Sequence, residues 1–273
     1  MTEIFPESYQ QQELIGLIPA AGKGSRLSPL PFSKELYPIG FLQLEDGQSV
    51  RPKPVCLNLL ERMKKAGVTR VYIVLREGKW DIPSYLGNGS ILNMYLAYIV
   101  MGQSPSVPYT LDQAFPFIKE SRVAFGFPDI IFEPDDAFVK LLERQTETGS
   151  DVVLGMFPVD SPDQNWDMVD CDEKGNVQKI SVKSKQTIST YTWIIAVWTP
   201  VFTNFMHQQL AIRYSGNKRD KVSYSGQRQQ EFFISDMIQE GIKQGLRVIG
   251  IEFAEGTCLD IGTPDGLERA LCL

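Results

Sequence analysis

A chain of 273 residues with 43% hydrophobic and 22% charged residues has the ordinary composition of a globular protein. At this length folding buries roughly 70–75% of the surface of the unfolded chain, so neither disulfides nor a structural metal is needed for stability. The formal net charge of −6 argues against general binding to nucleic acid or to membrane surfaces, because both attract cationic proteins.

The remaining composition excludes further classes. Cys56, Cys171, Cys258 and Cys272 lack the spacing of a zinc site and are expected to be reduced. His207 is the only histidine, so catalysis would depend on carboxylates, lysines, arginines or a metal held by oxygen. The N-terminus is polar, and no apolar run approaches the roughly 20 residues of a membrane span, so we expect a cytoplasmic protein.

The first organised stretch is an apolar strand followed by a glycine-containing loop. Residues 1–13 are polar and aperiodic and are interpreted as an extension, either loose or lying on a neighbouring subunit of a homo-oligomer. LIGLIPA then predicts a buried strand. Gly22 and Gly24 allow a sharp turn whose backbone N–H groups form an anion-binding concavity. Arg26 and Lys34 add positive charge suited to phosphates.

Two common phosphate-loop motifs do not fit this segment. A Walker-type loop, G-x-x-x-x-G-K-[ST], fails because Leu17 and Gly24 hold the positions of its first glycine and its Ser/Thr. A dinucleotide fingerprint fails because Leu27 replaces its third glycine. The alternative that remains is a strand-to-loop turn that binds nothing.

The following segments predict a layered α/β fold. A hairpin is expected around Asp46-Gly47, then a helix from Val55 that Gly67 ends, and a strand over 70–76. Further on we expect a strand over 94–101, a short helix over 110–118, and a strand from residue 122 that runs into an acidic turn. Asp135 and Asp136 are interpreted there as the N-cap and first turn of a helix.

The second half predicts more strands and three helices. A strand over 151–160 precedes a β-meander whose tight turn lies at 173–176. A strand from residue 190 leads into a helix at Thr199-Pro200. Residues 212–230 are polar and basic, which indicates a solvated loop or, alternatively, a lid over phosphates. A helix over 231–245, a strand and a last helix capped by Thr263 or Asp265 complete the chain.

Three segments, AAGKGSRL, FSKELYP and LDIGTPDGLERA, together resemble the signature of the sugar-1-phosphate nucleotidyltransferases, above all the glucose-1-phosphate thymidylyltransferase family. The resemblance covers residues 14–273 and implies one domain. Its fold would be a Rossmann-like three-layer α/β nucleotidyltransferase fold with a mostly parallel mixed central sheet and a small β-rich substrate-binding part. The nucleotide-binding part would extend over about 14–150 and the acceptor-binding part over about 151–273.

The resemblance also implies roles for the residues that touch the nucleotide. Arg26 would act on the leaving pyrophosphate and Lys34 beside the reacting phosphates. Gln103 would read the base, and a glutamine amide suits thymine or uracil, so dTTP or UTP is favoured. Thr110 stands near the base where the family has a glycine, and Gln103 is otherwise an exposed loop residue. The loop that would surround the triphosphate comprises Ala20, Ala21, Gly22, Lys23, Gly24 and Ser25.

The metal ligands implied by the resemblance are Asp129 and Asp260, which would hold Mg²⁺. Asp129 follows a strand end, where open α/β sheets bind ligands, although Pro128 precedes it where the family has a glycine. The alternative for Asp129 is an ordinary turn residue.

The acceptor side departs from the family pattern. Lys183 aligns with the lysine that holds the sugar phosphate, with Lys185 or a merely exposed lysine as alternatives. Asp167 and Trp193 stand where the family has glycines, so both are candidate acceptor-binding residues, and Val182 replaces a glutamate.

The sequence therefore predicts a Mg²⁺-dependent nucleotidyltransferase that joins a nucleoside triphosphate and a sugar-1-phosphate into a nucleotide sugar and pyrophosphate. Such chemistry needs positioning and charge neutralisation rather than a histidine. Two alternatives stay open. One is a non-catalytic regulatory paralogue that binds a nucleotide sugar, and the other is a nucleotidyltransferase acting on a non-glucose phosphorylated acceptor.

Overall fold

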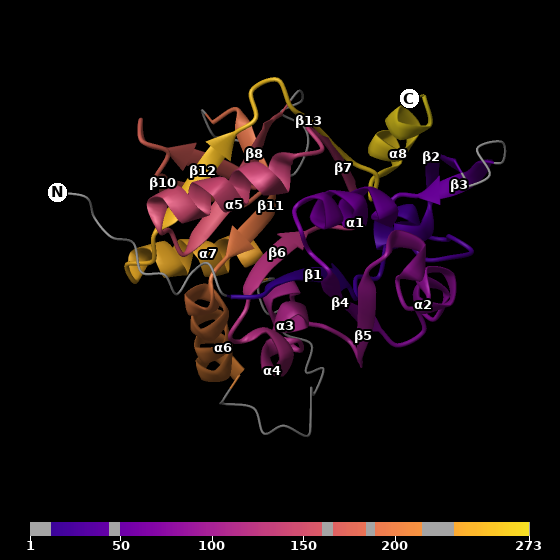
Figure 1. Ribbon diagram of the computed structural model, residues 1–273, viewed down its shortest axis with the longest axis horizontal. Coiled ribbons are helices and arrows are strands. Elements are labelled where there is room, and N and C mark those ends of the chain that lie inside the picture. Colours follow the sequence, from indigo (N-terminus) through magenta and orange to yellow (C-terminus); the bar gives the residue numbers. More distant parts are fainter. Residues whose placement is uncertain (1–11, 44–49, 160–165, 184–188, 215–231, 273) are drawn as a thin grey trace.

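A nine-stranded mixed sheet forms the centre of the molecule (Figure 1). The structure is a computed structural model that describes residues 12–43, 50–159, 166–183, 189–214 and 232–272. Hydrogen-bonded neighbours run in the order β10-β9-β11-β6-β1-β4-β5, while β8 pairs with β11 and with β12. The strands of this sheet are β1 (Leu14–Ala20), β4 (Arg70–Arg76), β5 (Tyr95–Met101), β6 (Arg122–Gly126), β8 (Val152–Pro158), β9 (Met168–Cys171), β10 (Val177–Ser181), β11 (Tyr191–Trp198) and β12 (Val248–Glu252).

Four of these strands, β6, β1, β4 and β5, are parallel neighbours. Ala20 at the end of β1 is in register with Leu75 of β4, and Leu17 is in register with Phe125 of β6. Because parallel strands end at the same edge of a sheet, the loops that follow β1, β4 and β6 begin beside one another. The continuous apolar runs in these strands fit a sheet that is covered on both faces.

Helices cover the two faces of the sheet and make two separate cores. Because successive side chains of a strand point to opposite faces of the sheet, Ile15 and Leu17 of β1 lie in one core and Ile18 and Ala20 in the other. The first core contains α3 (Val107–Asp112), α4 (Phe115–Ile118), α6 (Pro200–Tyr214) and α7 (Ile234–Lys243), and the second contains α1 (Cys56–Lys65), α2 (Asp81–Leu86) and α5 (Ala137–Thr148). The predicted three-layer α/β fold is therefore confirmed.

Two small antiparallel ribbons lie outside the main sheet. The ribbon of β2 (Pro38–Gln43) and β3 (Val50–Pro54) confirms the pairing of the predicted hairpin, although its turn lies outside the described residues. The second ribbon pairs β7 (Ile130–Glu133) with β13 (Thr257–Asp260). The sequence pattern did not indicate this ribbon, because it joins short segments that are more than a hundred residues apart. The last helix, α8 (Pro264–Leu271), follows β13 directly.

Several local expectations change in detail. The short helix predicted over 110–118 is two helices, α3 and α4, because the Ser106 side chain caps a helix that begins earlier and Pro116 has no N–H to continue it. Asp136 occupies the N-cap of α5 but pairs with Lys140 at 2.9 Å instead of capping the backbone. Residues 1–11 of the proposed extension, Lys185 and most of the basic loop lie outside the described residues. Within the described residues, no helix has the length and apolar character to cross a membrane.

We expect Thr263→Ala to lower the free energy of unfolding by about 1 kcal/mol, the usual cost of losing an N-cap. The Thr263 hydroxyl accepts a hydrogen bond from Gly266 N at 3.1 Å and donates one to Asp260 O at 3.1 Å. Urea unfolding measures the loss. Thr263→Ser keeps the hydroxyl and should unfold like the wild type; an unchanged midpoint for Thr263→Ala would show that the cap contributes nothing.

Candidate active site

The segment with Gly22 and Gly24, called the glycine loop below, begins where β1 ends at Ala20. Gly24 adopts a left-handed conformation with φ of +65°, which glycine adopts without strain. A single 3-10 turn, η2 (Ser25–Leu27), follows and carries Arg26. A second, η3 (Lys34–Leu36), carries Lys34, whose side chain passes within 4 Å of the position that a Gly24 Cβ would occupy. The predicted loop residues therefore do lie at the edge of the sheet, beside both predicted cations.

The two predicted metal ligands are brought together by the β7–β13 ribbon. Asp129 lies between β6 and β7, and Asp260 is the last residue of β13. The ribbon places Asp260 opposite Ile130, and the N–H of Ile261 donates to the backbone carbonyl of Asp129 at 3.0 Å. Backbone pairing thus sets the relative position of two carboxylates that lie 131 positions apart in the sequence.

A glycine keeps the space between these carboxylates open. The N–H of Gly262 donates to Asp260 Oδ1 at 2.7 Å. A Cβ on Gly262 would lie 2.6 Å from Asp129 Oδ2, 2.8 Å from Asp260 Oδ1 and 3.3 Å from Arg26 Nη2. The three charged groups therefore converge on the space that a side chain at residue 262 would occupy. Sequence reasoning did not assign Gly262 a role, although it follows Asp260 by two residues in the LDIGTP motif.

Each carboxylate has its own cation. The Lys34 ammonium contacts Asp129 Oδ2, and both side chains are largely buried. Arg26 Nη1 lies 3.3 Å from Asp260 Oδ2, with the arginine side chain 58% exposed. Lys34 is therefore held in the site by burial and pairing, whereas Arg26 can reorient toward a ligand.

The pKa values follow from this arrangement. Burial alone would raise the pKa of Asp129, but the adjacent Lys34 ammonium outweighs burial and holds that pKa below its ordinary value. The pKa of Asp260 is raised, first by burial and then by the negative charge of Asp129. Burial would lower the pKa of Lys34, yet Asp129 and Glu35 raise it, so the lysine stays charged. The carboxylates thus differ in environment although they belong to one site.

The donor set fits a small, oxygen-seeking divalent cation. Among the described residues, no cluster of three or more His, Cys, Asp or Glu side chains offers a protein cage for a metal. Two carboxylates that both lie beside Gly262 match Mg²⁺, which is usually bound by one or two carboxylates together with substrate phosphates and water. Asp129 and Asp260 are the residues that could hold it.

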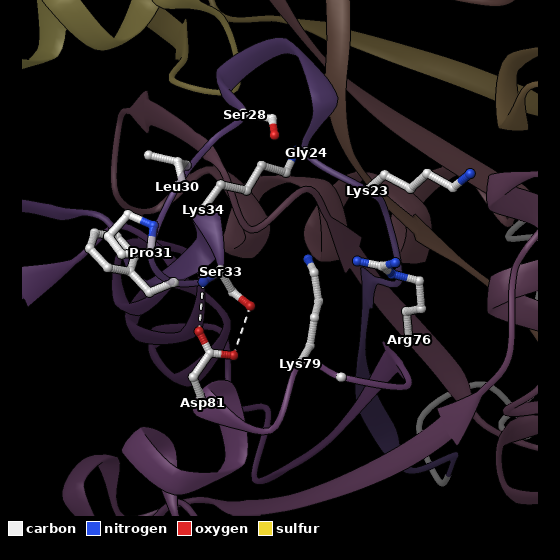
Figure 2. A pocket seen from close by; sticks show the side chains of 12 residues that line it. Lys23, Gly24, Ser28, Leu30, Pro31, Ser33, Lys34, Arg76, Lys79 and Asp81 are labelled. Atoms are coloured by element: carbon white, nitrogen blue, oxygen red, sulfur yellow. Dashed lines mark hydrogen bonds between the residues drawn. The ribbon is translucent and has the colours of Figure 1, made fainter.

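A buried ion pair lies beneath the loop that carries Lys34. Lys79 Nζ donates to both oxygens of Glu35, at 2.7 and 2.8 Å, and the two residues are only 6% and 2% exposed. Nearby, Asp81 accepts hydrogen bonds from Ser33 N at 2.6 Å and Ser33 Oγ at 2.8 Å (Figure 2). These contacts fix η3 against the segment after β4. No spacing or motif in the sequence indicated them.

The base-side candidates lie on the segment after β5. Gln103 is exposed, whereas Thr110 is 3% exposed. The Thr110 hydroxyl is 2.6 Å from Ser104 Oγ and 3.2 Å from the carbonyl of Ser106. Thr110 therefore holds the turn that follows Gln103.

The acceptor-side candidates form a second cluster. The N–H of Lys183 donates to Asp167 Oδ1 at 3.1 Å, and Ser235 Oγ donates to Asp167 Oδ2 at 2.5 Å. Trp193 is 3% exposed, and its indole N–H donates to Ser235 Oγ at 2.9 Å. The Lys183 ammonium lies 4.0 Å from the centre of the Phe233 ring. Burial raises the pKa of Asp167 despite these hydrogen bonds. Sequence reasoning missed Ser235 and Phe233, which reach the cluster from the other end of the chain.

Comparison with known proteins shows the family of the chain. A family model described as nucleotidyl transferase matches residues 15–272. The chain therefore belongs to the nucleotidyl transferase family, which confirms the family resemblance predicted from the sequence motifs. It is similar to the low-salt glycan biosynthesis nucleotidyltransferase Agl11 of Haloferax volcanii, with 25% identity over 93% of this chain, and it spans 64% of that relative's length.

Solved structures share the fold at lower identity. One is described as a glucose-1-phosphate thymidylyltransferase from Bacillus anthracis in complex with sucrose, with a TM-score of 0.74, 22% identity, and coverage of 95% of this chain and 94% of the other. Another is a UDP-glucose pyrophosphorylase complexed with UDP-glucose, with a TM-score of 0.73, 18% identity, and coverage of 95% and 97%. At these identities the likeness establishes the fold.

We expect Gly262→Ala to fold normally but to weaken divalent-cation binding by about 10- to 100-fold, because the new Cβ would push both carboxylates from their positions. Titration with Mn²⁺, followed by the loss of the signal of the free ion, measures the affinity. Gly102→Ala is the matched control, since a Cβ there meets nothing within 4 Å. Equal affinity in the two variants would show that no cation binds between the carboxylates.

We expect Lys79→Met to destabilise the fold by about 3–5 kcal/mol, because it leaves the buried Glu35 carboxylate without its partner. The double variant Glu35→Leu/Lys79→Met replaces the pair with apolar side chains and should recover most of that loss. Urea unfolding of both variants measures the difference. If single and double variants were equally unstable, the ion pair itself would not be the cause.

Proposed function

We propose that the chain is a Mg²⁺-dependent pyrophosphorylase that joins a nucleoside triphosphate and a sugar-1-phosphate, producing a nucleotide sugar and pyrophosphate. The observation that supports this most directly is that Asp129, Asp260 and Arg26 converge beside Gly262. Lys34, the second cation, is paired with Asp129. Two carboxylates with two cations form an arrangement suited to phosphoryl groups and a metal ion.

In the proposed reaction a phosphate oxygen of the acceptor forms a bond to the α-phosphorus, and the bond to the bridging oxygen of the β-phosphate breaks. Pyrophosphate leaves with the electron pair of that bond. Arg26 would donate hydrogen bonds to the departing group, since it is exposed and its guanidinium can form two parallel contacts. Lys34 would contribute a fixed charge beside the reacting phosphates, because its pKa is raised and it is buried.

Asp129 and Asp260 would hold the cation, which when bound supplies charge neutralisation and Lewis acidity at the phosphates. Gln103 would read thymine or uracil with Thr110 holding its turn, Lys183 would position the acceptor phosphate, and the enzyme would work in the cytoplasm, as a homo-oligomer or as a monomer.

The acceptor cluster favours a second candidate, a nucleotidyltransferase whose phosphorylated acceptor is not glucose-1-phosphate. Asp167 places a carboxylate between the Lys183 N–H and the Ser235 hydroxyl, both of which donate hydrogen bonds to it. A carboxylate there accepts hydrogen bonds from hydroxyl or ammonium groups, so it would recognise an acceptor rich in donors.

The test is pyrophosphate release in the presence of Mg²⁺, with each nucleoside triphosphate combined with a panel of sugar-1-phosphates and phosphorylated alcohols. We expect release with dTTP or UTP and one acceptor class, and a loss of roughly 10²–10³ in rate for Arg26→Ala, the usual cost of one electrostatic group in a transition state. Product analysis by mass spectrometry identifies the acceptor.

Arg269→Ala is the control for loss of a surface arginine, since Arg269 lies on α8 outside the proposed contacts. Full activity of Arg26→Ala would refute its assigned role. Nucleotide-sugar binding without pyrophosphate release from any acceptor would instead support the regulatory paralogue.

A further inference from the structure

The start of α7 lies against the residues that are proposed to bind the acceptor substrate. Ile234 and Met237 bury part of α7 in the hydrophobic core, where they are 3% and 0% exposed. The side chain of Gln239 accepts a hydrogen bond from the N–H of Ile180 at 2.7 Å, and Ile180 lies on β10, the strand that leads to Lys183. The helix is therefore fixed both to the core and to the strand before Lys183.

The hydrogen bonds that join Trp193, Ser235 and Asp167 run in a single direction. The indole nitrogen of Trp193 can only donate, so Ser235 Oγ is the acceptor in their 2.9 Å contact. The one proton of the Ser235 hydroxyl then goes to Asp167 Oδ2 at 2.5 Å. Trp193 and Ser235 are 3% and 0% exposed. Two buried residues thus hold the half-buried Asp167 carboxylate as a hydrogen-bond acceptor.

Asp167 in turn fixes the backbone of Lys183. The N–H of Lys183 donates to Asp167 Oδ1 at 3.1 Å, and Lys183 has a φ of +45°, which a lysine rarely adopts. Asp167 itself is held from β11, because the hydroxyl of the buried Thr192 donates to its carbonyl oxygen at 2.9 Å. An unfavourable backbone conformation persists where surrounding contacts fix it, so the carboxylate helps to keep Lys183 in place.

The ammonium group of Lys183 meets the same end of α7. It lies 4.0 Å from the centre of the Phe233 ring, within the range of a cation–π interaction. The N–H of Phe233 donates to Asp236 Oδ2 at 2.8 Å, which fixes Phe233 at the start of the helix. An ammonium group carries three N–H donors, and those that point away from the ring can bind phosphate oxygens.

We propose that the start of α7 positions the acceptor site, with Ser235 orienting Asp167 and Phe233 holding the Lys183 ammonium. This inference rests on the proposed function, in which Lys183 positions the acceptor phosphate. Ser235 and Phe233 act through these two residues and are positioning residues rather than catalytic residues. Trp193 acts one step further back, through Ser235. The nucleoside triphosphate would bind beside the glycine loop, so loss of either positioning residue should affect the acceptor substrate alone.

The first test measures KM and kcat for pyrophosphate release by the full chain, with the acceptor that the substrate panel identifies. We expect Ser235→Ala to raise KM for the acceptor about 10-fold, because a hydrogen bond to a charged group is lost, and to leave KM for the nucleoside triphosphate unchanged. Ser150→Ala is the matched control. Ser150 is also 0% exposed, and its hydroxyl contacts that of Thr148 at 2.9 Å.

A pH profile separates orientation of the carboxylate from a general loss of structure. Burial raises the pKa of Asp167, and the hydrogen bond from Ser235 lowers it. Loss of that bond should raise the pKa further, so the acid limb of kcat/KM for the acceptor should move to higher pH in Ser235→Ala. Lys183 and Asp236, the charged groups that also act on Asp167, are unchanged in this variant. Trp193→Phe keeps the Ser235 hydroxyl and should move the limb less.

The second test removes the ring beside the Lys183 ammonium. We expect Phe233→Leu to raise KM for the acceptor about 2- to 5-fold, the usual worth of an exposed cation–π interaction, and Phe233→Tyr to keep the wild-type value. Phe232→Leu is the matched control, because the neighbouring Phe232 ring lies 4.1 Å from the guanidinium of Arg213, a different cation.

Three results would overturn the inference. One is an acceptor KM in Ser235→Ala no higher than in Ser150→Ala, in an enzyme whose wild type releases pyrophosphate; the proposed function would then stand. Another is an equal loss of affinity for both substrates together with a lower urea midpoint, which would show that Ser235 only stabilises the fold. The third is a wild-type protein that releases no pyrophosphate with any acceptor, which would refute the proposed function and the inference with it.

Discussion

The repulsion between Asp129 and Asp260 is the constraint on which the rest of the site depends. Both carboxylates reach the same point beside Gly262 and both are largely removed from water, so each destabilises the charged form of the other. Ion pairs with Lys34 on one carboxylate and Arg26 on the other compensate this repulsion. These four charged residues come from segments far apart in the chain. The glycine loop, the η3 turn, the β6–β7 connection and the end of β13 must therefore all meet at one edge of the sheet.

The supporting structure keeps that meeting point rigid. The sheet has a hydrophobic core on each face, so the ends of β1, β4 and β6 cannot shift independently. Backbone pairing between β7 and β13 sets the distance between the two aspartates, and Thr263 holds the start of α8 directly after it. Beneath Lys34, the buried Glu35–Lys79 pair fixes a turn that would otherwise be a mobile surface loop.

The two halves of the site differ in how closely they follow the family signature. The proposed phosphate side keeps the glycine loop, its cations and both aspartates. The proposed acceptor side instead holds Asp167, Ser235 and a buried Trp193 in one hydrogen-bonded cluster. Phosphoryl chemistry is demanding in charge and geometry, whereas acceptor recognition depends on a few donors and acceptors that can be exchanged without altering the sheet. Divergence on the acceptor side is thus compatible with an unchanged fold.

The sequence by itself determined the class of fold and most strands and helices, and it also predicted the residues of the proposed phosphate side. It could do so because apolar periodicity and turn residues are local signals, and because Arg26, Lys34, Asp129 and Asp260 lie in motifs of recognisable spacing. Only the tertiary structure decided which distant residues meet, at the β7–β13 ribbon, beside Gly262 and in the Glu35–Lys79 pair. Each of these joins residues that are distant in sequence or carry no motif. Their proximity follows from strand register and burial, and both are properties of the packed sheet rather than of any short segment.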